Sequence, residues 1–170
     1  PQEQSLAATV LVLVEAGSKY ETKDINGLSH FLEHMCFKGT EKRPRSIDIA
    51  SELASIGAVS NAFTSLEYTG YYAKSAAHHL PIIIDVVSDI YLNPVFDEKE
   101  IVKERGVIIE EMNMVQDTPM RYVSELWLKL LYGDQPAGWE IIGTKEAIER
   151  VSQKDFLQYR GEHYLANSTV

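Results

Sequence analysis

The sequence is poor in cysteine, in positive charge and in long apolar runs. Cys36 is the only cysteine in 170 residues, so no disulfide can form within the chain, which favours a reducing, cytoplasmic location. Lysine and arginine number 16 against 25 acidic residues, and the net charge of −9 argues against binding to nucleic acid or to an anionic membrane. The longest apolar run, residues 6–14, is too short to span a bilayer and predicts a buried strand.

The hydrophobic and charged content of the chain is typical of one globular domain. The chain is 45% hydrophobic and 24% charged, and its length allows a core without disulfide or metal staples. No internal repeat or linker interrupts it, so residues 1–170 are expected to form a single domain. Pro1 stands where a methionine would start a protein, and a strand-like segment begins at the last residues. The chain is therefore expected to be a fragment of a longer protein.

The order of the predicted elements indicates an α+β fold. β-branched and aromatic residues predict an early strand and a later hairpin, and amphipathic patterns predict a series of helices. The predicted strands are residues 8–14, 58–65 and 67–75, and the predicted helices are residues 28–37, 47–56, 78–92, 98–116, 121–132, 145–150 and 153–164. Because the strands come first, we expect an antiparallel sheet with helices packed on one face.

Several local features complete this prediction. Residues 15–27 carry glycines and charges and are expected to form an exposed loop. Ser46 and Asp97 are predicted to cap the helices that follow them. Cys36 is expected to be a thiol of the core, and Trp127 is also expected in the core.

Residues 30–34 read HFLEH and place two histidines and a glutamate on one side of a helix. Because residues three and four apart stack, His30 and His34 can present two imidazole nitrogens to one ion, with Glu33 beside its open side. Zinc accepts such ligands, and a catalytic site adds a third protein ligand and a water whose proton a carboxylate can take. The alternative is an exposed polar turn, although the apolar neighbours favour a partly buried helix.

The third ligand is expected to be an acid on the long helix predicted at residues 98–116. Glu104 and Glu111 are seven residues apart, two helical turns, so both project from nearly the same face. Glu110 is rotated by about 100° and is the weaker candidate. Apolar residues on this helix indicate that it packs partly inside, where a glutamate must be paired or ligated. The residues alone leave both Glu104 and Glu111 open as ligands.

The segment HFLEHMCFKGT, with ERGVIIEEM downstream, resembles the pitrilysin-type metallopeptidases, the family of insulin-degrading enzyme and mitochondrial processing peptidase. The resemblance runs from about residue 9 to the end and is strongest with the processing-peptidase-like bacterial branch. In this family the glutamate ligand follows the motif after about 76 residues. In this chain 76 residues separate His34 from Glu111. The resemblance therefore implies one zinc ion per chain, bound by His30, His34 and Glu111.

The resemblance also implies roles for other residues. Glu33 would be the general base that activates water and later returns its proton to the leaving amine. Glu104 would support catalysis by orienting a ligand and tuning its charge. The segment NAFTSLEYTGYY is similar to the family's edge strand, which binds substrate peptide as an added strand. The residues expected to hold the substrate are Asn61, Ala62, Phe63 and Thr64.

The implied function is that of a zinc metalloendopeptidase, which hydrolyses peptides or unfolded segments through zinc-activated water. Family members work with two homologous halves, so residues 1–170 are expected to be the N-terminal catalytic half. The expected partner is a homologous C-terminal half or a second subunit, and efficient cleavage is expected to need it. Surface left open by the missing half predicts self-association.

Two alternatives to the enzyme remain. The first is a non-catalytic structural or substrate-presenting subunit of the same fold. Such relatives usually lose a motif residue, whereas all five motif positions are intact here. The second is a purely structural zinc site, which the free acid at position 33 makes less favoured.

Overall fold

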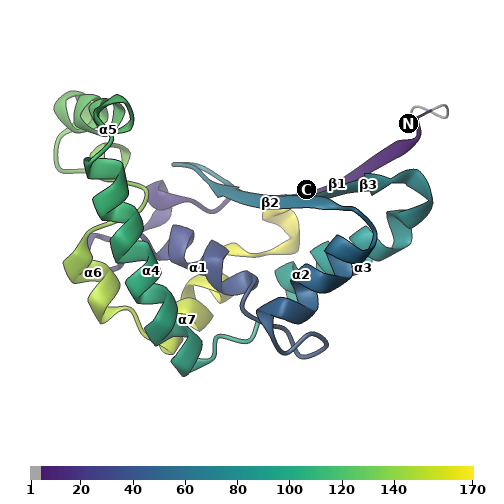
Figure 1. Cartoon of the computed structure of the whole chain (residues 1–170). Helices are drawn as coiled ribbons and strands as arrows, with labels where there is room; N and C mark the ends of the chain where they lie inside the picture. Colours follow the sequence, from purple (N-terminus) through teal and green to yellow (C-terminus); the bar gives the residue numbers. More distant parts are fainter. Residues whose placement is uncertain (1–4) are drawn as a thin grey trace.

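The computed structural model describes residues 5–170, which form a three-stranded antiparallel sheet with helices beneath one face (Figure 1). The strands are β1 (Ala7–Val14), β2 (Val59–Thr64) and β3 (Thr69–Ala76), in the spatial order β1-β3-β2. The helices are α1 (Leu28–Cys36), α2 (Ser46–Ser55), α3 (Leu80–Leu92), α4 (Glu98–Gln116), α5 (Pro119–Tyr132), α6 (Lys145–Arg150) and α7 (Gln153–His163). This architecture confirms the α+β prediction.

Strand register decides which side chains meet the helices. Tyr71 on β3 lies opposite Val12 on β1 and Ala62 on β2, so these three side chains share the face that the helices cover. Leu11 and Phe63 point to the opposite face, and both are partly exposed. The face that carries Tyr71 is therefore the side on which the sheet contacts α1.

Of the two outer strands, β2 keeps its outer edge open within residues 5–170. It pairs with β3 alone and also contacts α1. On the far side of β1, Leu13 and Val170 exchange two backbone hydrogen bonds of 2.8 and 2.9 Å. An extended segment can therefore add to the sheet beside β2, as the sequence predicted for an edge strand.

One apolar core holds the helices against the sheet. Phe31 on α1 contacts Phe156 on α7 edge to face, with ring centroids 4.9 Å apart. Phe156 in turn stacks on Phe96, which precedes α4. Cys36 lies in this core, as predicted. Within the described residues no helix is both long enough and apolar enough to cross a membrane.

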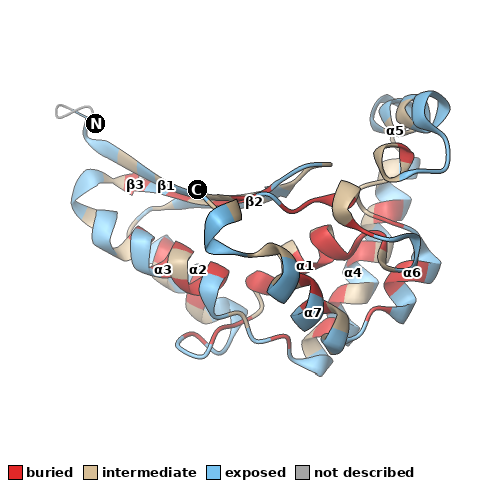
Figure 2. Ribbon diagram, turned by 180° about the vertical axis from the view of Figure 1, so that it is seen from behind, coloured by how far each residue is buried: buried red, intermediate tan, exposed pale blue. Residues whose placement is uncertain are grey.

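One of the two predicted helix caps agrees with the structure, and the other cap and one core prediction do not. Asp97 caps α4 as predicted, because its side chain accepts from the backbone amides of the first turn. Ser46 is the first residue of α2 and does not cap it; the extended backbone of Arg45 occupies the cap position. Trp127 is 57% exposed, so its prediction as a core residue is wrong. It lies on α5, which has no buried residue and contacts the end of α4 at one end of the molecule (Figure 2).

The segment of residues 15–27 is not the exposed loop that its composition predicts. Two short 3-10 turns, Ser18–Tyr20 and Lys23–Ile25, order it. Glu21 and Asn26 are buried, because their polar side chains bond to each other and to backbone groups at the start of α1. Most charged residues of this segment therefore lie at the surface, whereas Glu21 is buried and supports the start of α1.

Candidate metal centre

Helix α1 carries its ionisable residues along one half-buried stripe. Leu28, Phe31 and Leu32, on its other sides, are fully buried in the core. The helix has this orientation because its apolar side chains take the inside positions, and the remaining stripe faces α4 and β2. Residues of the stripe are His30, Glu33, His34, Phe37 and Lys38, the last two lying just beyond the helix end.

The structure places Glu111 of α4 opposite the two histidines of α1. His30, His34 and Glu111 each offer one ligand atom, and these atoms lie within 4.8 Å of one another. Oε2 of Glu111 is 3.9 Å from Nε2 of His30 and 3.7 Å from Nε2 of His34. Glu110 is exposed on the next face of α4, and Glu104 faces another atom of His34. The geometry thus separates two candidates that the sequence alone left open.

These three residues fit a zinc ion. Tetrahedral zinc with ligands at about 2.0–2.1 Å has its ligand atoms about 3.3–3.4 Å apart. The two distances from Glu111 to the histidines, 3.9 and 3.7 Å, are slightly longer than this. Two imidazole nitrogens and one carboxylate oxygen form a donor set that catalytic zinc sites use. Burial, together with the neighbouring His34, lowers the pKa of His30 to about 4, which keeps this imidazole in the neutral form that binds metal.

Glu104 holds His34 in the orientation that a metal ligand needs. Its buried carboxylate lies 2.8 Å from Nδ1 of His34 and 2.5 Å from Nζ of Lys38. Burial acts to raise the pKa of Glu104, but these two partners outweigh burial and lower it. With Nδ1–H donating to Glu104, the lone pair of Nε2 faces Glu111. The sequence analysis missed Lys38, although its position four residues after His34 places it on the same stripe.

Glu33 lies on the same stripe as the histidines, and its carboxylate is not one of the three clustered ligand atoms. The hydroxyl of Thr64 donates a hydrogen bond of 2.5 Å to Oε2 of Glu33. Burial raises the pKa of Glu33, although the bond from Thr64 works in the opposite direction. A carboxylate with a raised pKa beside a metal centre is suited to accept a proton and then to release it.

A cavity of about 320 Å³ joins this centre to the edge strand. Glu33, His34 and Glu104 line one side, and Asn61 and Ala62 of β2 line the other. Two of the four predicted substrate-binding residues thus line the cavity.

The other two predicted substrate-binding residues contact other parts of the protein. Thr64 bonds to Glu33. The ring of Phe63 covers Gly70 on the open face of the sheet, where an added Cβ would lie 2.3 Å from the ring. Thr64 and Phe63 are therefore less available to contact a peptide than the sequence predicts.

Comparison with known proteins agrees with this geometry. The family model described as Insulinase (Peptidase family M16) matches residues 2–145. A zinc protease of Bacillus subtilis, YmxG, is 41% identical over 159 residues, which are 94% of this chain and 39% of that protein. The human mitochondrial-processing peptidase subunit beta is 41% identical over 156 residues, which are 92% of this chain and 32% of that subunit. The chain thus spans about two fifths or less of the length of these relatives.

Solved structures show the same fold. A protease from Helicobacter pylori superimposes with a TM-score of 0.92 at 25% identity, over 99% of this chain and 41% of that one. Pitrilysin superimposes with a TM-score of 0.86 at 24% identity, over 98% of this chain and 18% of its own. The matched residues include both segments that carry the metal centre. This chain therefore belongs to the insulinase family of peptidases, family M16.

Proposed function

We propose that this chain is the zinc-binding catalytic half-domain of a metalloendopeptidase that hydrolyses peptides or unfolded segments. The observation that carries the proposal is the cluster of His30, His34 and Glu111, whose ligand atoms lie within 4.8 Å of one another. The carboxylate of Glu33 lies on the same helix stripe and is not one of these ligand atoms. Relatives of the chain include proteins named as zinc proteases, which supports the same chemistry.

His30, His34 and Glu111 would bind the zinc, and Glu104 would keep His34 in the tautomer that ligates. Zinc, when bound there, supplies a Lewis acid that polarises the scissile carbonyl and increases the acidity of water. Glu33 takes one proton from the water whose oxygen attacks the carbonyl carbon. It then gives that proton to the leaving nitrogen as the carbon–nitrogen bond breaks, so that the carboxylate is regenerated.

The open edge of β2 would hold the peptide beside this centre. A peptide added as a strand receives main-chain hydrogen bonds from the edge, with its side chains pointing alternately toward and away from the cavity. Asn61 and Ala62 line that cavity together with Glu33. Main-chain binding gives affinity with loose sequence selectivity, which suits unfolded substrates.

We propose that a homologous second half completes the enzyme. The chain spans 39% of the Bacillus relative and 32% of the human one, so most of each relative lies outside the matched region. The companion half would close over the cavity and the open edge of β2. Peptide hydrolysis is therefore best assayed with such a half present.

Metal content of the purified chain tests the proposal. We expect one zinc per chain in the wild type and in Glu110→Ala, an exposed neighbour on the same helix, and loss of zinc in Glu111→Ala. Zinc retained in Glu111→Ala would contradict the assigned ligand set. A folded wild type without zinc would instead favour the non-catalytic structural or substrate-presenting subunit.

A further inference from the structure

The N-terminal end of α1 rests on a buried carboxylate that has no part in the metal centre described above. Glu21 is 4% exposed. Its Oε2 accepts hydrogen bonds from the backbone amide of Gly27 at 2.8 Å and from Nδ2 of Asn26 at 3.0 Å, and its Oε1 accepts from the amide of Ser29 at 2.7 Å. All three partners donate, which favours the ionised carboxylate and works against the rise in the pKa of Glu21 that burial causes. Glu21 thus satisfies amides that the helix itself leaves without partners.

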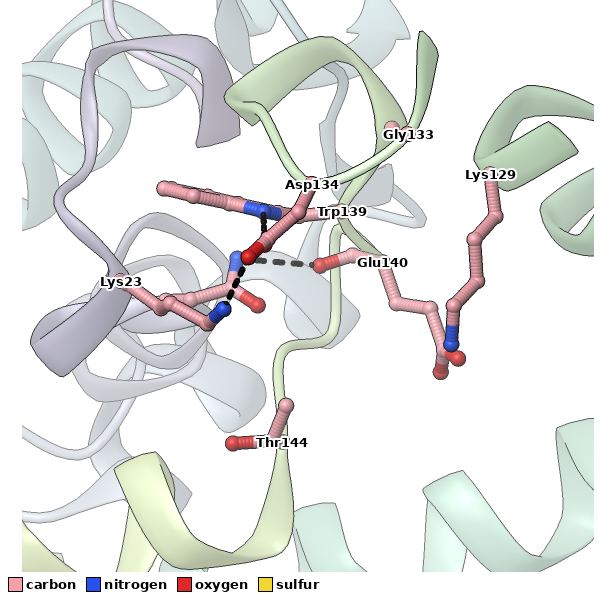
Figure 3. Close-up of a pocket in the computed structure, with 9 residues that line it drawn as sticks. Lys23, Lys129, Gly133, Asp134, Trp139, Glu140 and Thr144 are labelled. Carbon is pink, nitrogen blue, oxygen red and sulfur yellow. Dashed lines mark hydrogen bonds and ion pairs between the residues drawn. The ribbon is translucent and has the colours of Figure 1, made fainter. Parts of the chain in front are cut away.

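A second segment holds the same helix end from the other side. Nδ2 of Asn26 also donates to the backbone oxygen of Glu140 at 3.2 Å. Gly27 and Gly143 approach so closely that a Cβ on Gly143 would lie 2.2 Å from the backbone oxygen of Asn26. Figure 3 shows the chain from Gly133 to Thr144 passing this point. The first turn of α1 is therefore held between Glu21 and this segment.

The segment opposite Glu21, residues 133–144, is itself held by hydrogen bonds. Asp134 accepts from Nζ of Lys23 and, at 2.9 Å, from the indole of Trp139 (Figure 3). A cavity of about 380 Å³ lies between this segment and α5. Lys23 and Asn26 line this cavity too, and the segment itself packs on the end of α5, where a Cβ on Gly138 would lie 3.2 Å from Cβ of Tyr132.

The charge of Glu21 also affects metal binding, in addition to the effect of its hydrogen bonds on the position of α1. The amino end of a helix carries about half a positive elementary charge, which falls off within the first turn. His30 is the third residue of α1, so a dication bound there would meet this positive end. A buried carboxylate at the helix end offsets that repulsion. Because α1 carries both histidines, a rotation of its first turn would also move His30 away from Glu111.

We propose that Glu21 is a positioning residue for the metal helix, whose carboxylate fixes the first turn of α1 and offsets its positive end, and so sets the affinity of His30 and His34 for zinc. The inference rests on the proposed zinc function and adds to it a residue that touches neither the metal ligands nor the substrate.

Zinc affinity of the whole chain, measured by competition with a chromophoric chelator, tests this role. Glu21→Gln keeps the shape of the side chain but removes its charge, and we expect its affinity to fall about tenfold or more. The matched control is Asp89→Asn on α3. Asp89 is also buried and accepts three bonds, from Thr40, Arg43 and Asn93 at 2.6, 2.7 and 3.0 Å. Both variants lose a buried charge and stability, but only the first should lose zinc affinity.

The outcomes separate positioning from a merely structural role. A folded Glu21→Gln chain that binds zinc within about twofold of the wild type overturns the proposal, as does an equal loss in Asp89→Asn. Should Glu21→Gln not fold, Glu21→Asp keeps the charge but withdraws the carboxylate by one methylene. We then expect about threefold weaker binding, and wild-type affinity in that variant overturns the proposal. A folded wild type that binds no zinc overturns the zinc function itself, a result distinct from failure of Glu21 alone.

Discussion

The hydroxyl of Thr64 donates a hydrogen bond of 2.5 Å to Oε2 of Glu33. Thr64 is the last residue of β2 and Glu33 lies in the middle of α1, so this bond joins the edge strand to the proposed general base. The bond also lowers the pKa of Glu33 against the effect of burial. A peptide that adds to β2 therefore meets a base whose orientation is set by the same strand.

Thr64→Val tests this connection. The variant keeps the shape of the side chain but removes the donor, so the pKa of Glu33 should rise further and more of it should be protonated at mildly acidic pH. We expect zinc content to stay unchanged and peptide hydrolysis to fall about tenfold, which corresponds to one charged hydrogen bond. Kinetics with a fluorogenic peptide and the companion half present should show a larger loss at about pH 6 than at about pH 8.

Thr64→Ser is the matched control, since it restores the hydroxyl on a smaller side chain. Equal loss in the serine and valine variants would show that any change in the shape of side chain 64 lowers hydrolysis, and the effect would then not be assigned to the hydrogen bond. A valine variant with an unaltered pH profile would also contradict the connection.

Glu33→Gln should separate metal binding from hydrolysis. The amide cannot accept a proton from water, yet the side chain is not one of the clustered ligand atoms. We expect zinc binding within about twofold of the wild type and a loss of peptide hydrolysis of about a hundredfold or more. Zinc analysis and peptide kinetics on the same preparation check both parts. Loss of zinc in this variant would mean that Glu33 ligates, and the assignment of the base would then fail.

Glu104→Gln should weaken zinc binding without removing a ligand. The variant loses the charge that bonds to His34 and Lys38, so His34 is less firmly held with Nε2 toward Glu111. We expect about tenfold weaker zinc binding, compared with no change in Glu110→Gln on the exposed face of the same helix. Chelator competition measures both. Equal affinities in the two variants would show that the bond to His34 does not support the site.

The stability of the metal-free chain should depend on pH through His30. Burial lowers the pKa of His30 from 6.5 to about 4, so the unfolded chain takes up a proton at this residue at a higher pH than the folded chain does. Stability present above about pH 6.5 is then lost as the pH falls toward about 4, by up to about 3 kcal/mol. His34 works in the opposite direction: its raised pKa adds stability below about pH 6.5 that is lost as the pH rises through that pKa.

Comparison with His30→Asn isolates the first contribution, because the His34 contribution is common to both proteins. Urea unfolding between about pH 7.5 and pH 4 should show the variant losing less stability than the wild type. Parallel pH dependences in the two proteins would contradict the buried, neutral state of His30.

Much of the site could be predicted because the helical repeat is a local rule. Residues three and four apart share a helix face in any fold, so HFLEH placed His30, Glu33 and His34 together before the structure was known. The choice between Glu104 and Glu111 depended on how α4 lies against α1, which spacing within one helix cannot decide. The resemblance decided it, and the observed geometry has Glu111 opposite both Nε2 atoms.

Three of the errors have a common cause, since each depended on residues distant in the sequence. Glu21 lies in a segment that is charged and glycine-rich, yet it is buried because the amides of α1 need acceptors. Trp127 is predicted in the core, but it lies on α5, which has no buried residue. Thr64 was expected to face substrate, and only the meeting of β2 with α1 shows that it bonds Glu33.

The exposed apolar face of α5 predicts self-association of the chain. Met120, Val123, Trp127 and Leu130 recur at helical spacing and are all exposed, Leu130 by 77%. A contiguous apolar face of this kind marks an interaction surface on a soluble protein. We expect the wild type to form dimers or larger species at micromolar concentration, and Met120→Glu with Leu130→Glu to be monomeric by sedimentation velocity. Because both side chains are exposed, the free energy of unfolding should change by less than about 0.5 kcal/mol.

The matched control places the same two charges elsewhere. Leu157→Glu with Leu165→Glu alters two exposed leucines in and after α7, at 56% and 43% exposure, and should leave self-association unchanged. A monomeric wild type would contradict the prediction outright. Equal dissociation in both double variants would mean that net charge controls association and that α5 does not, since adding two charges of the same sign to a chain of net charge −9 increases repulsion wherever they are placed. Dissociation confined to the α5 variant therefore identifies the helix face itself as the contact.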